Sequence, residues 1–164
     1  MLTGRAFKFG DDISTDLIIP GKYSYLRSNL PELAKHVMED ADTTFVSRVK
    51  EGDFIVGGSN FGLGSSREHA PLVIKMAGVK AILAKSVARI FFRNAINLGL
   101  PAVVAPQASL ACAAGDELEI DLVAGEIRNL TQGRVVEAAS LDPRAVELIA
   151  AGGLIPYLKR KYAA

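Results

Sequence analysis

The residues whose types and order could do chemistry gather in one stretch, residues 60–71, which reads Asn-Phe-Gly-Leu-Gly-Ser-Ser-Arg-Glu-His-Ala-Pro. Gly62 and Gly64 permit a backbone with positive φ and allow the main chain to approach a ligand closely. A short apolar run precedes the stretch and a helical pattern follows it, so it should join a strand to a helix. Open α/β sheets bind their ligands at such junctions, beyond the carboxyl ends of parallel strands.

Three polar residues follow the glycines directly: Ser65, Ser66 and Arg67. The two serines bring hydroxyl and N–H groups to the expected start of the helix, where the helix dipole favours anions. Arg67 adds a planar guanidinium that can bind a carboxylate or a phosphate through two hydrogen bonds. These residues predict an anion site, and they do not say which anion it binds.

The same residues also fit a tight turn with a serine that caps the helix, and this alternative stays open. The stretch lacks the Gly-Lys-Ser/Thr ending of a P-loop and the third glycine of a dinucleotide-binding fingerprint. It also lacks the Gly-x-Ser-x-Gly order of a hydrolase nucleophile elbow. These three kinds of site are therefore excluded for this stretch.

The elements around the stretch alternate between strand and helix, which predicts parallel β-α-β units. Gly78 and Gly99 each follow a helical pattern, in the position where glycine commonly ends a helix. The expected strands are residues 53–56, 80–84 and 102–104, and the expected helices are residues 67–77 and 87–98.

The first fifty residues are expected to form shorter elements. In order, these are an edge strand at 5–9, a polar loop at 11–16, a buried strand at 17–19, a loop at 23–30 and a helix at 31–38. The helix pattern has leucine and valine four residues apart, with Ser28 or Asn29 as its cap.

The last fifty residues differ in character. Alternating runs separated by Ala-Gly and Gln-Gly turns predict an antiparallel meander of three strands, 117–122, 126–130 and 134–138. Pro143 begins a helix as a first-turn proline, and a Gly-Gly pair separates it from a last helix, 154–162. The whole chain, residues 1–164, is therefore expected to form one α/β domain with a parallel βαβ core and an antiparallel β flank.

Composition narrows the possible partners. The chain has 164 residues with 19 Lys plus Arg against 18 Asp plus Glu, a net charge of +1, so nothing predicts binding to nucleic acid or an anionic membrane. The N-terminus has no apolar signal-peptide segment, and no apolar run approaches the ~20 residues of a membrane span. A cytoplasmic protein is expected.

Cys112 is the sole cysteine. The chain can therefore form no intrachain disulfide, and it cannot hold an iron–sulfur cluster, which needs three or four thiolates. No metal site is expected in this chain. Because alanines surround Cys112, it is expected to be a small buried or half-buried hydrophobe rather than a nucleophile.

Three motifs resemble, in order, the signature sequences of the swivelling domain of the aconitase superfamily. They are residues 9–20 (FGDDISTDLIIP), 64–71 (GSSREHAP) and 84–101 (AKSVARIFFRNAINLGLP). The length and the ending, residues 151–158, resemble the stand-alone small subunits of 3-isopropylmalate dehydratase and homoaconitase. The resemblance covers nearly the whole chain and implies the swivelling β/β/α domain of that superfamily.

The resemblance implies a hydro-lyase that isomerises a 2-hydroxy di- or tricarboxylate by dehydration and rehydration. Ser65 would be the catalytic base that takes a proton from the carbon beside a substrate carboxylate, helped by cationic and N–H neighbours. Ser66, Arg67 and Gly64 would bind substrate, and Asp16 matches an acidic active-site position that orients a partner group. The Lewis acid would be a [4Fe-4S] cluster in a separate large subunit, which this chain would need for activity.

Arg27 bears on the substrate. In the superfamily the loop after the Ile-Pro segment meets the variable part of the substrate: apolar residues suit an isopropyl group, and arginine suits an extra carboxylate. Residues 25–28, Tyr-Leu-Arg-Ser, resemble the homoaconitase loop, although this loop is one residue longer and its spacing is similar to that of aconitase itself. Family frequency favours 3-isopropylmalate, Arg27 favours a tricarboxylate, and a rim arginine in a solvated loop also fits.

Two functions of other classes remain. The chain could be a stand-alone regulatory module that cradles a phosphate or carboxylate, or a structural subunit whose self-association hides its apolar loop. Co-purification with a brown, cluster-bearing partner would separate the regulatory module from the hydro-lyase, and replacement of Ser65 by alanine would separate the structural role from catalysis.

Overall fold

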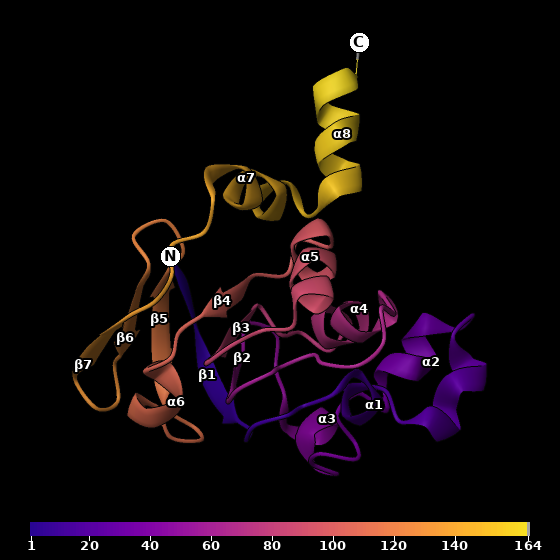
Figure 1. Ribbon diagram of the computed structural model, residues 1–164, viewed down its shortest axis with the longest axis horizontal. Coiled ribbons are helices and arrows are strands. Elements are labelled where there is room, and N and C mark those ends of the chain that lie inside the picture. Colours follow the sequence, from indigo (N-terminus) through magenta and orange to yellow (C-terminus); the bar gives the residue numbers. More distant parts are fainter. Residues whose placement is uncertain (164) are drawn as a thin grey trace.

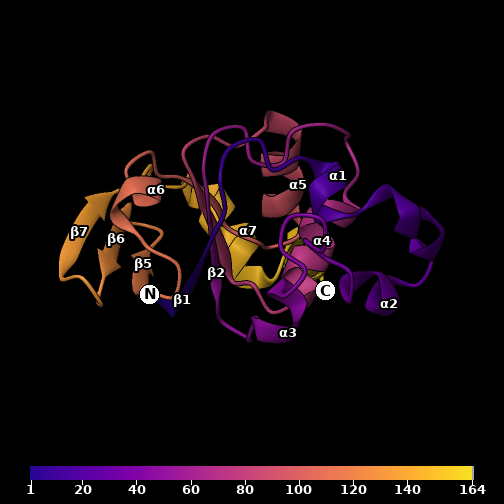
Figure 2. The ribbon, with the colours of Figure 1, turned by 90° about the horizontal axis from the view of Figure 1, so that it is seen from below.

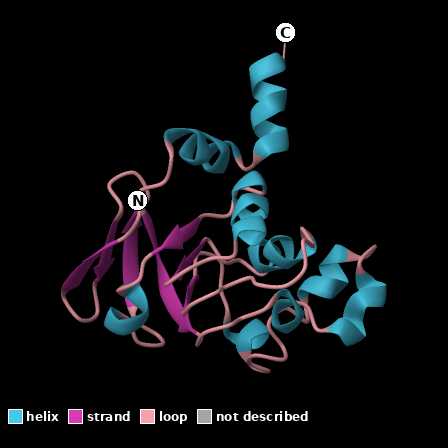
Figure 3. Cartoon of the chain, viewed as in Figure 1, coloured by secondary structure: helices cyan, strands magenta, loops and turns pink. Residues whose placement is uncertain are grey.

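The computed structural model describes residues 1–163, and Figures 1 and 3 show how its helices and strands are arranged. The strands are β1 Leu2–Lys8, β2 Phe54–Gly57, β3 Ala81–Ala84, β4 Ala102–Val104, β5 Glu117–Asp121, β6 Glu126–Asn129 and β7 Arg134–Glu137. The helices are α1 Thr15–Ile18, α2 Leu30–Ala34, α3 Phe45–Arg48, α4 His69–Met76, α5 Arg89–Asn97, α6 Ala108–Ala111, α7 Pro143–Ala151 and α8 Leu154–Tyr162. A 3-10 helix, Gly21–Leu26, connects α1 to α2.

The seven strands form one sheet in the order β4-β3-β2-β1-β5-β6-β7. Strand β1 belongs to both halves, because residues 6–8 pair in parallel with β2 and residues 2–5 pair antiparallel with β5. The sheet continues as parallel β3 and β4 on one side and as antiparallel β6 and β7 on the other. The predicted α/β class, with a parallel βαβ core and an antiparallel flank, is confirmed.

Both faces of the parallel half are buried. Figure 2 shows α1, α4 and α5 on one side of β1 and β2, with the antiparallel strands and α6 on the other. Side chains of β2 alternate between the two apolar clusters, with Ile55 facing the helices and Phe54 and Val56 facing the flank. Because neither face meets water, the strands are continuous apolar runs rather than alternating ones.

The βαβ elements and the C-terminal elements follow the sequence prediction closely. Strand β4 and helix α8 have the predicted bounds, and the three flank strands pair as the predicted meander. Gly78 and Gly99 follow α4 and α5 with φ of 104° and 74°, as expected of glycines that end helices. Within residues 1–163, no helix is long and apolar enough to cross a bilayer.

The predicted strand at residues 17–19 is wrong, because Leu17 and Ile18 belong to helix α1 and Ile19 is its C-cap. The Ser14 side chain caps that helix by accepting a hydrogen bond from the Leu17 N–H at 3.2 Å. Ile18 is fully buried, so the apolar run at this position indicates burial and not an extended backbone. A capping serine was thus a stronger local signal than the β-branched isoleucines.

Other predictions for the first fifty residues are also corrected. Strand β1 is central and not at the edge, since alternation tells which face is buried and not how many neighbours a strand has. Asn29 does cap α2, but that helix ends at Ala34 rather than at residue 38. The predicted loop at 23–30 contains much of the 3-10 helix, and the short helices α3 and α6 are additional elements.

Candidate functional site

Most of the stretch singled out from the sequence lies in a loop, residues 58–68, between β2 and α4, and its last three residues begin α4. It runs against the segment between β1 and α1 and is fixed to it by main-chain hydrogen bonds. The Gly62 N–H donates to the Ile13 carbonyl at 2.7 Å, and the Thr15 N–H donates to the Leu63 carbonyl at 2.8 Å. Two motifs about fifty residues apart in sequence therefore build one site.

Two glycines are required by the shape of this loop. Gly62 has a φ of 79°, and a Cβ atom there would lie 2.2 Å from the Phe91 ring. Gly64 has a φ of 115°, and its Cβ would lie 2.9 Å from the Thr15 hydroxyl oxygen. Both positions combine a left-handed backbone with close packing, which only glycine accommodates without strain.

The Ser65 hydroxyl oxygen lies at the centre of several donors. Arg67 Nε donates to Ser65 Oγ at 2.8 Å, and the Arg67 main-chain N–H approaches the same oxygen at 3.4 Å. Thr15 Oγ1 lies 3.3 Å from Ser65 Oγ and accepts the Ser65 main-chain N–H at 3.0 Å. Ser65 itself is half-buried, so the oxygen is held firmly but remains reachable.

Arg67 also connects Ser65 to Asp16. Its Nη2 donates to Asp16 Oδ1 at 2.9 Å, while its Nε holds Ser65 Oγ. The Asp16 side chain is 74% exposed and that of Arg67 is 27% exposed. The structure thus brings three of the predicted site residues into one hydrogen-bonded chain that opens to the surface.

The serines do not lie directly at the start of α4, as the predicted helix 67–77 would have placed them. The helix begins at His69, with Glu68 as its cap, and no serine side chain caps it. The alternative of a serine N-cap is therefore wrong. Ser66 is exposed, and its carbonyl accepts a hydrogen bond from Asn94 Nδ2 of α5 at 3.1 Å.

Arg27 lies apart from this cluster. It follows the 3-10 helix Gly21–Leu26 and is exposed, and within residues 1–163 no hydrogen bond or ion pair joins it to Ser65 or Arg67. The helix before it is fixed by Glu39, which accepts hydrogen bonds from Tyr23 Oη and from His36 Nδ1, each at 2.8 Å. Arg27 is therefore exposed to solvent at the end of a 3-10 helix that these hydrogen bonds hold in place.

The donor set does not fit an iron–sulfur cluster. Within the described part of the chain, no three His, Cys, Asp or Glu side chains are grouped so that they could hold a metal ion. Cys112, the one thiol, is buried among the flank residues, as predicted. Burial and the nearby Asp116 carboxylate raise the pKa of that thiol, which makes it a poor ligand and nucleophile.

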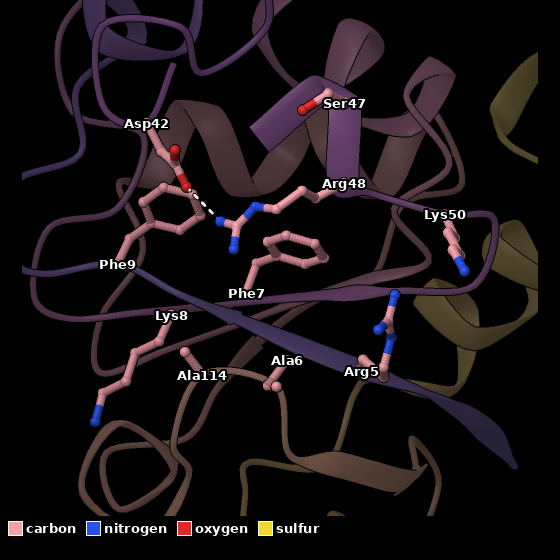
Figure 4. A pocket seen from close by; sticks show the side chains of 11 residues that line it. Arg5, Ala6, Phe7, Lys8, Phe9, Asp42, Ser47, Arg48, Lys50 and Ala114 are labelled. Atoms are coloured by element: carbon pink, nitrogen blue, oxygen red, sulfur yellow. Dashed lines mark hydrogen bonds and ion pairs between the residues drawn. The ribbon is translucent and has the colours of Figure 1, made fainter. Parts of the chain in front are cut away.

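A separate hollow of about 450 Å³ runs beside β1, below α3 (Figure 4). Arg48 lies across it, with Nη2 2.8 Å from Asp42 Oδ2 and the guanidinium 5.4 Å from the centre of the Phe7 ring. Lys8 and Lys50 extend outward in different directions (Figure 4). The lining cations do not converge, and the Ser65 loop does not line this hollow.

Sequence reasoning missed two residues that hold the site. Thr15 lies in the recognised motif of residues 9–20, beside the charged Asp16, and its hydroxyl contacts both the N–H and the Oγ of Ser65. Asn94 lies in the recognised motif of residues 84–101, and its side-chain amide donates a hydrogen bond to the Ser66 carbonyl. Both are uncharged polar residues inside recognised motifs, and that placement is the signal that could have found them.

The geometry can stabilise a negative charge on the Ser65 oxygen. Arg67 supplies a permanent cation and a directed N–H, and charge-assisted hydrogen bonds of this kind are the strong ones. Because Gly64, Ser66 and Asp16 are exposed around it, the site is an open surface rather than an enclosed pocket. A second surface would be needed to exclude water from it.

Comparisons with known proteins agree with this picture. Residues 15–108 match the model of the aconitase C-terminal domain family. The chain is 56% identical over 159 residues to 3-isopropylmalate dehydratase small subunit 2 of Archaeoglobus fulgidus, covering 97% of this chain and 95% of that one. It is 50% identical over 163 residues to the isopropylmalate/citramalate isomerase small subunit of Methanocaldococcus jannaschii, covering 99% and 96%.

A solved structure is similar throughout. The crystal structure of a 3-isopropylmalate dehydratase chain from Methanocaldococcus jannaschii superposes with a TM-score of 0.91 at 48% identity, covering 99% of this chain and 95% of that one. The family-model match, the two relatives and the solved structure all include the loop that holds Ser65. The chain therefore belongs to the family of 3-isopropylmalate dehydratase small subunits, which share the aconitase C-terminal domain.

Proposed function

We propose that this chain works as the small subunit of a two-chain 3-isopropylmalate dehydratase and that Ser65 is the base of its hydro-lyase reaction. The observation that carries the proposal is the 2.8 Å hydrogen bond from Arg67 Nε to Ser65 Oγ, in a half-exposed loop. A neutral serine hydroxyl is far too weak to take a carbon-bound proton. A cation and N–H groups aimed at its oxygen favour the ionised form that could do so.

In the proposed reaction, Ser65 as an alkoxide takes the proton from the substrate carbon beside a carboxylate. The electron pair of that C–H bond forms a carbon–carbon double bond as hydroxide leaves from the neighbouring carbon. In rehydration, hydroxide adds to the carbon that lost the proton, and Ser65 returns the proton to the carbon that lost the hydroxyl, so the two groups exchange places. Arg67 holds the ionised oxygen, and Asp16 fixes the far end of the guanidinium. The exposed main chain at Gly64 and Ser66, together with Arg67, binds a substrate carboxylate.

The proposal includes a large-subunit partner. Names of the relatives describe small subunits, which implies a larger chain. The exposed Asp16 and Ser66, which lie beside Ser65, support a partner that covers this surface. Because the chain has a single, buried thiol, we place the family's [4Fe-4S] cluster on the partner. We also propose that the assembled pair is cytoplasmic.

The proposed substrate is 3-isopropylmalate, after the names of the relatives. The name of the M. jannaschii relative adds citramalate, and both acids carry two carboxylates and a hydrocarbon group. Arg27 is the observation that favours a second candidate, a citrate- or homocitrate-like tricarboxylate, because it is an exposed cation in the loop predicted to meet the variable group.

The experiment is co-expression of the chain with its large subunit, followed by assays on 3-isopropylmalate. Ser65→Ala should lower turnover by about 100- to 10,000-fold, the usual contribution of a general base, without loss of assembly. Ser47→Ala is the matched control, because Ser47 is an exposed serine on α3 whose hydroxyl donates to the nearby Thr44 carbonyl. Unchanged turnover in Ser65→Ala would remove Ser65 from the mechanism, and a colourless, partner-free protein that binds phosphate would indicate a regulatory module.

A further inference from the structure

We infer that the Thr15 hydroxyl is a positioning group for the reaction, which donates a hydrogen bond to the ionised Ser65 oxygen and holds it beside Arg67. This inference rests on the proposed role of Ser65 as the base and adds to it a third donor. Thr15 is the first residue of α1 and lies fifty positions before Ser65 in the sequence.

The Thr15 side chain is buried, with 2% of its surface exposed. Its Oγ1 accepts the Ser65 main-chain N–H at 3.0 Å, which occupies one lone pair. Among residues 1–163, the other atom within hydrogen-bond distance of Oγ1 is Ser65 Oγ, at 3.3 Å. A buried hydroxyl hydrogen needs an acceptor, so the proton of Thr15 is directed to Ser65.

The number of donors around Ser65 Oγ suits an anion better than a hydroxyl. A neutral serine oxygen offers two lone pairs and keeps its own hydrogen, whereas an alkoxide offers three lone pairs. Three donors surround this oxygen: Arg67 Nε, the Arg67 main-chain N–H and the Thr15 hydroxyl. All three can be satisfied together once Ser65 has lost its proton to solvent, and Thr15 keeps its own proton throughout.

The position of the Thr15 hydroxyl is set by its surroundings on both sides. The Thr15 N–H is bonded to the Leu63 carbonyl at 2.8 Å, and its carbonyl accepts the Ile19 N–H at 2.9 Å. A Cβ atom at Gly64 would lie 2.9 Å from Oγ1, so the absence of a side chain there gives the hydroxyl its place. The donor is thus fixed before substrate arrives, which is what electrostatic stabilisation requires.

The test compares Thr15→Val, Thr15→Ala and Thr15→Ser in the complex assembled with the large subunit. Each of the first two removes the hydroxyl, and the third keeps it. We expect Thr15→Val and Thr15→Ala to lower kcat at neutral pH about 10- to 100-fold, the usual effect of losing a hydrogen bond to a charged group, with little change in KM. The rising limb of the kcat–pH profile should move to higher pH in both, and Thr15→Ser should return it toward the wild-type position.

The matched control is Thr131→Val. That threonine is exposed and also accepts a main-chain N–H, from Glu117 at 2.8 Å, but it lies in the antiparallel flank. The kcat–pH profile of Thr131→Val should match that of the wild type. An unshifted profile in Thr15→Val or Thr15→Ala would overturn the inference, as would failure of both to assemble when Thr15→Ser assembles, since the hydroxyl would then serve folding.

Ser65→Ala, run in parallel, separates this inference from the function it rests on. If Ser65→Ala retains turnover, Ser65 is not the base and both proposals fail. If Ser65→Ala is inactive while Thr15→Val has an unshifted profile, the role of Ser65 stands and that of Thr15 falls.

Discussion

Arg67 donates from Nε to the hydroxyl oxygen of Ser65, two residues before it, at 2.8 Å. The same guanidinium reaches Asp16 with Nη2 at 2.9 Å, so one planar group joins two segments of the site. Lysine cannot make this pair of contacts, because its charge is a single point on a flexible stem. The shape of the arginine, and not only its charge, should therefore matter.

Arg67→Lys should lower kcat of the assembled enzyme about 100-fold, as does the loss of one donor to a developing anion in other enzymes. Steady-state kinetics measure the effect. Arg128→Lys is the matched control, because Arg128 also contacts two side chains at once, the carboxylates of Glu126 and Glu119, but on the exposed face of the flank. Turnover of Arg67→Lys within threefold of wild type would show that charge alone suffices.

Arg27→Ala should change the choice of substrate rather than the chemistry. If Arg27 meets a third carboxylate, its loss should lower kcat/KM for a tricarboxylate at least tenfold relative to that for 3-isopropylmalate, whose isopropyl group needs no cation. The measurement is a competition assay with wild type and variant. An unchanged ratio would identify Arg27 as a rim residue without a role in specificity, and Arg144→Ala, in exposed α7, controls for loss of surface charge.

Gly62→Ala should destabilise the chain much more than Gly133→Ala. Both glycines have positive φ, 79° and 64°, so each substitution costs about 1–2 kcal/mol of backbone strain. A Cβ at Gly62 also meets the Phe91 ring at 2.2 Å, whereas at Gly133 it meets open space. Overpacking should add about 1–3 kcal/mol at Gly62, measurable by urea unfolding. Equal losses would mean that Phe91 moves aside freely.

Glu39→Gln should reveal how much the Glu39 carboxylate, which holds the 3-10 helix before Arg27, contributes to the free energy of unfolding at different pH values. Hydrogen bonds from His36 and Tyr23, with help from Lys22, lower the pKa of Glu39 from 4.5 to about 2. A depressed folded-state pKa contributes stability that is fully present above pH 4.5 and is lost as the pH falls to about 2. Urea unfolding at several pH values should show wild type more stable than Glu39→Gln at pH 6, with the gap closing toward pH 2. A constant gap would contradict this.

The βαβ core and the β flank could be predicted because their signals are local. Apolar runs such as residues 81–84 are bounded by glycines and turns, and burial on both faces makes them easy to recognise. The segment around Ile18 was harder, because a four-residue helix and a short strand look alike in an apolar run. Only the Ser14 cap distinguishes them, and its weight depends on packing that the sequence does not show.

The sequence could predict which residues form the site, but not all of the hydrogen bonds that join them. Ser65 and Arg67 are two positions apart in sequence, so their contact is local, and Asp16 was placed with them by resemblance alone. The hydrogen bond of Thr15 depends on the pairing of two loops fifty residues apart, which no local pattern reports. Arg27 was assigned to the substrate by residue type, and its solvent position in the isolated chain follows from the 3-10 helix before it.

The most direct test of the account is a structure of the assembled pair with bound 3-isopropylmalate. We expect Ser65 Oγ about 3–3.5 Å from the substrate carbon that loses its proton, with Arg67 still bonded to that oxygen and the surface around Asp16 covered by the large subunit. A structure in which Ser65 faces solvent, away from the bound substrate, would contradict the central claim that its oxygen is the base.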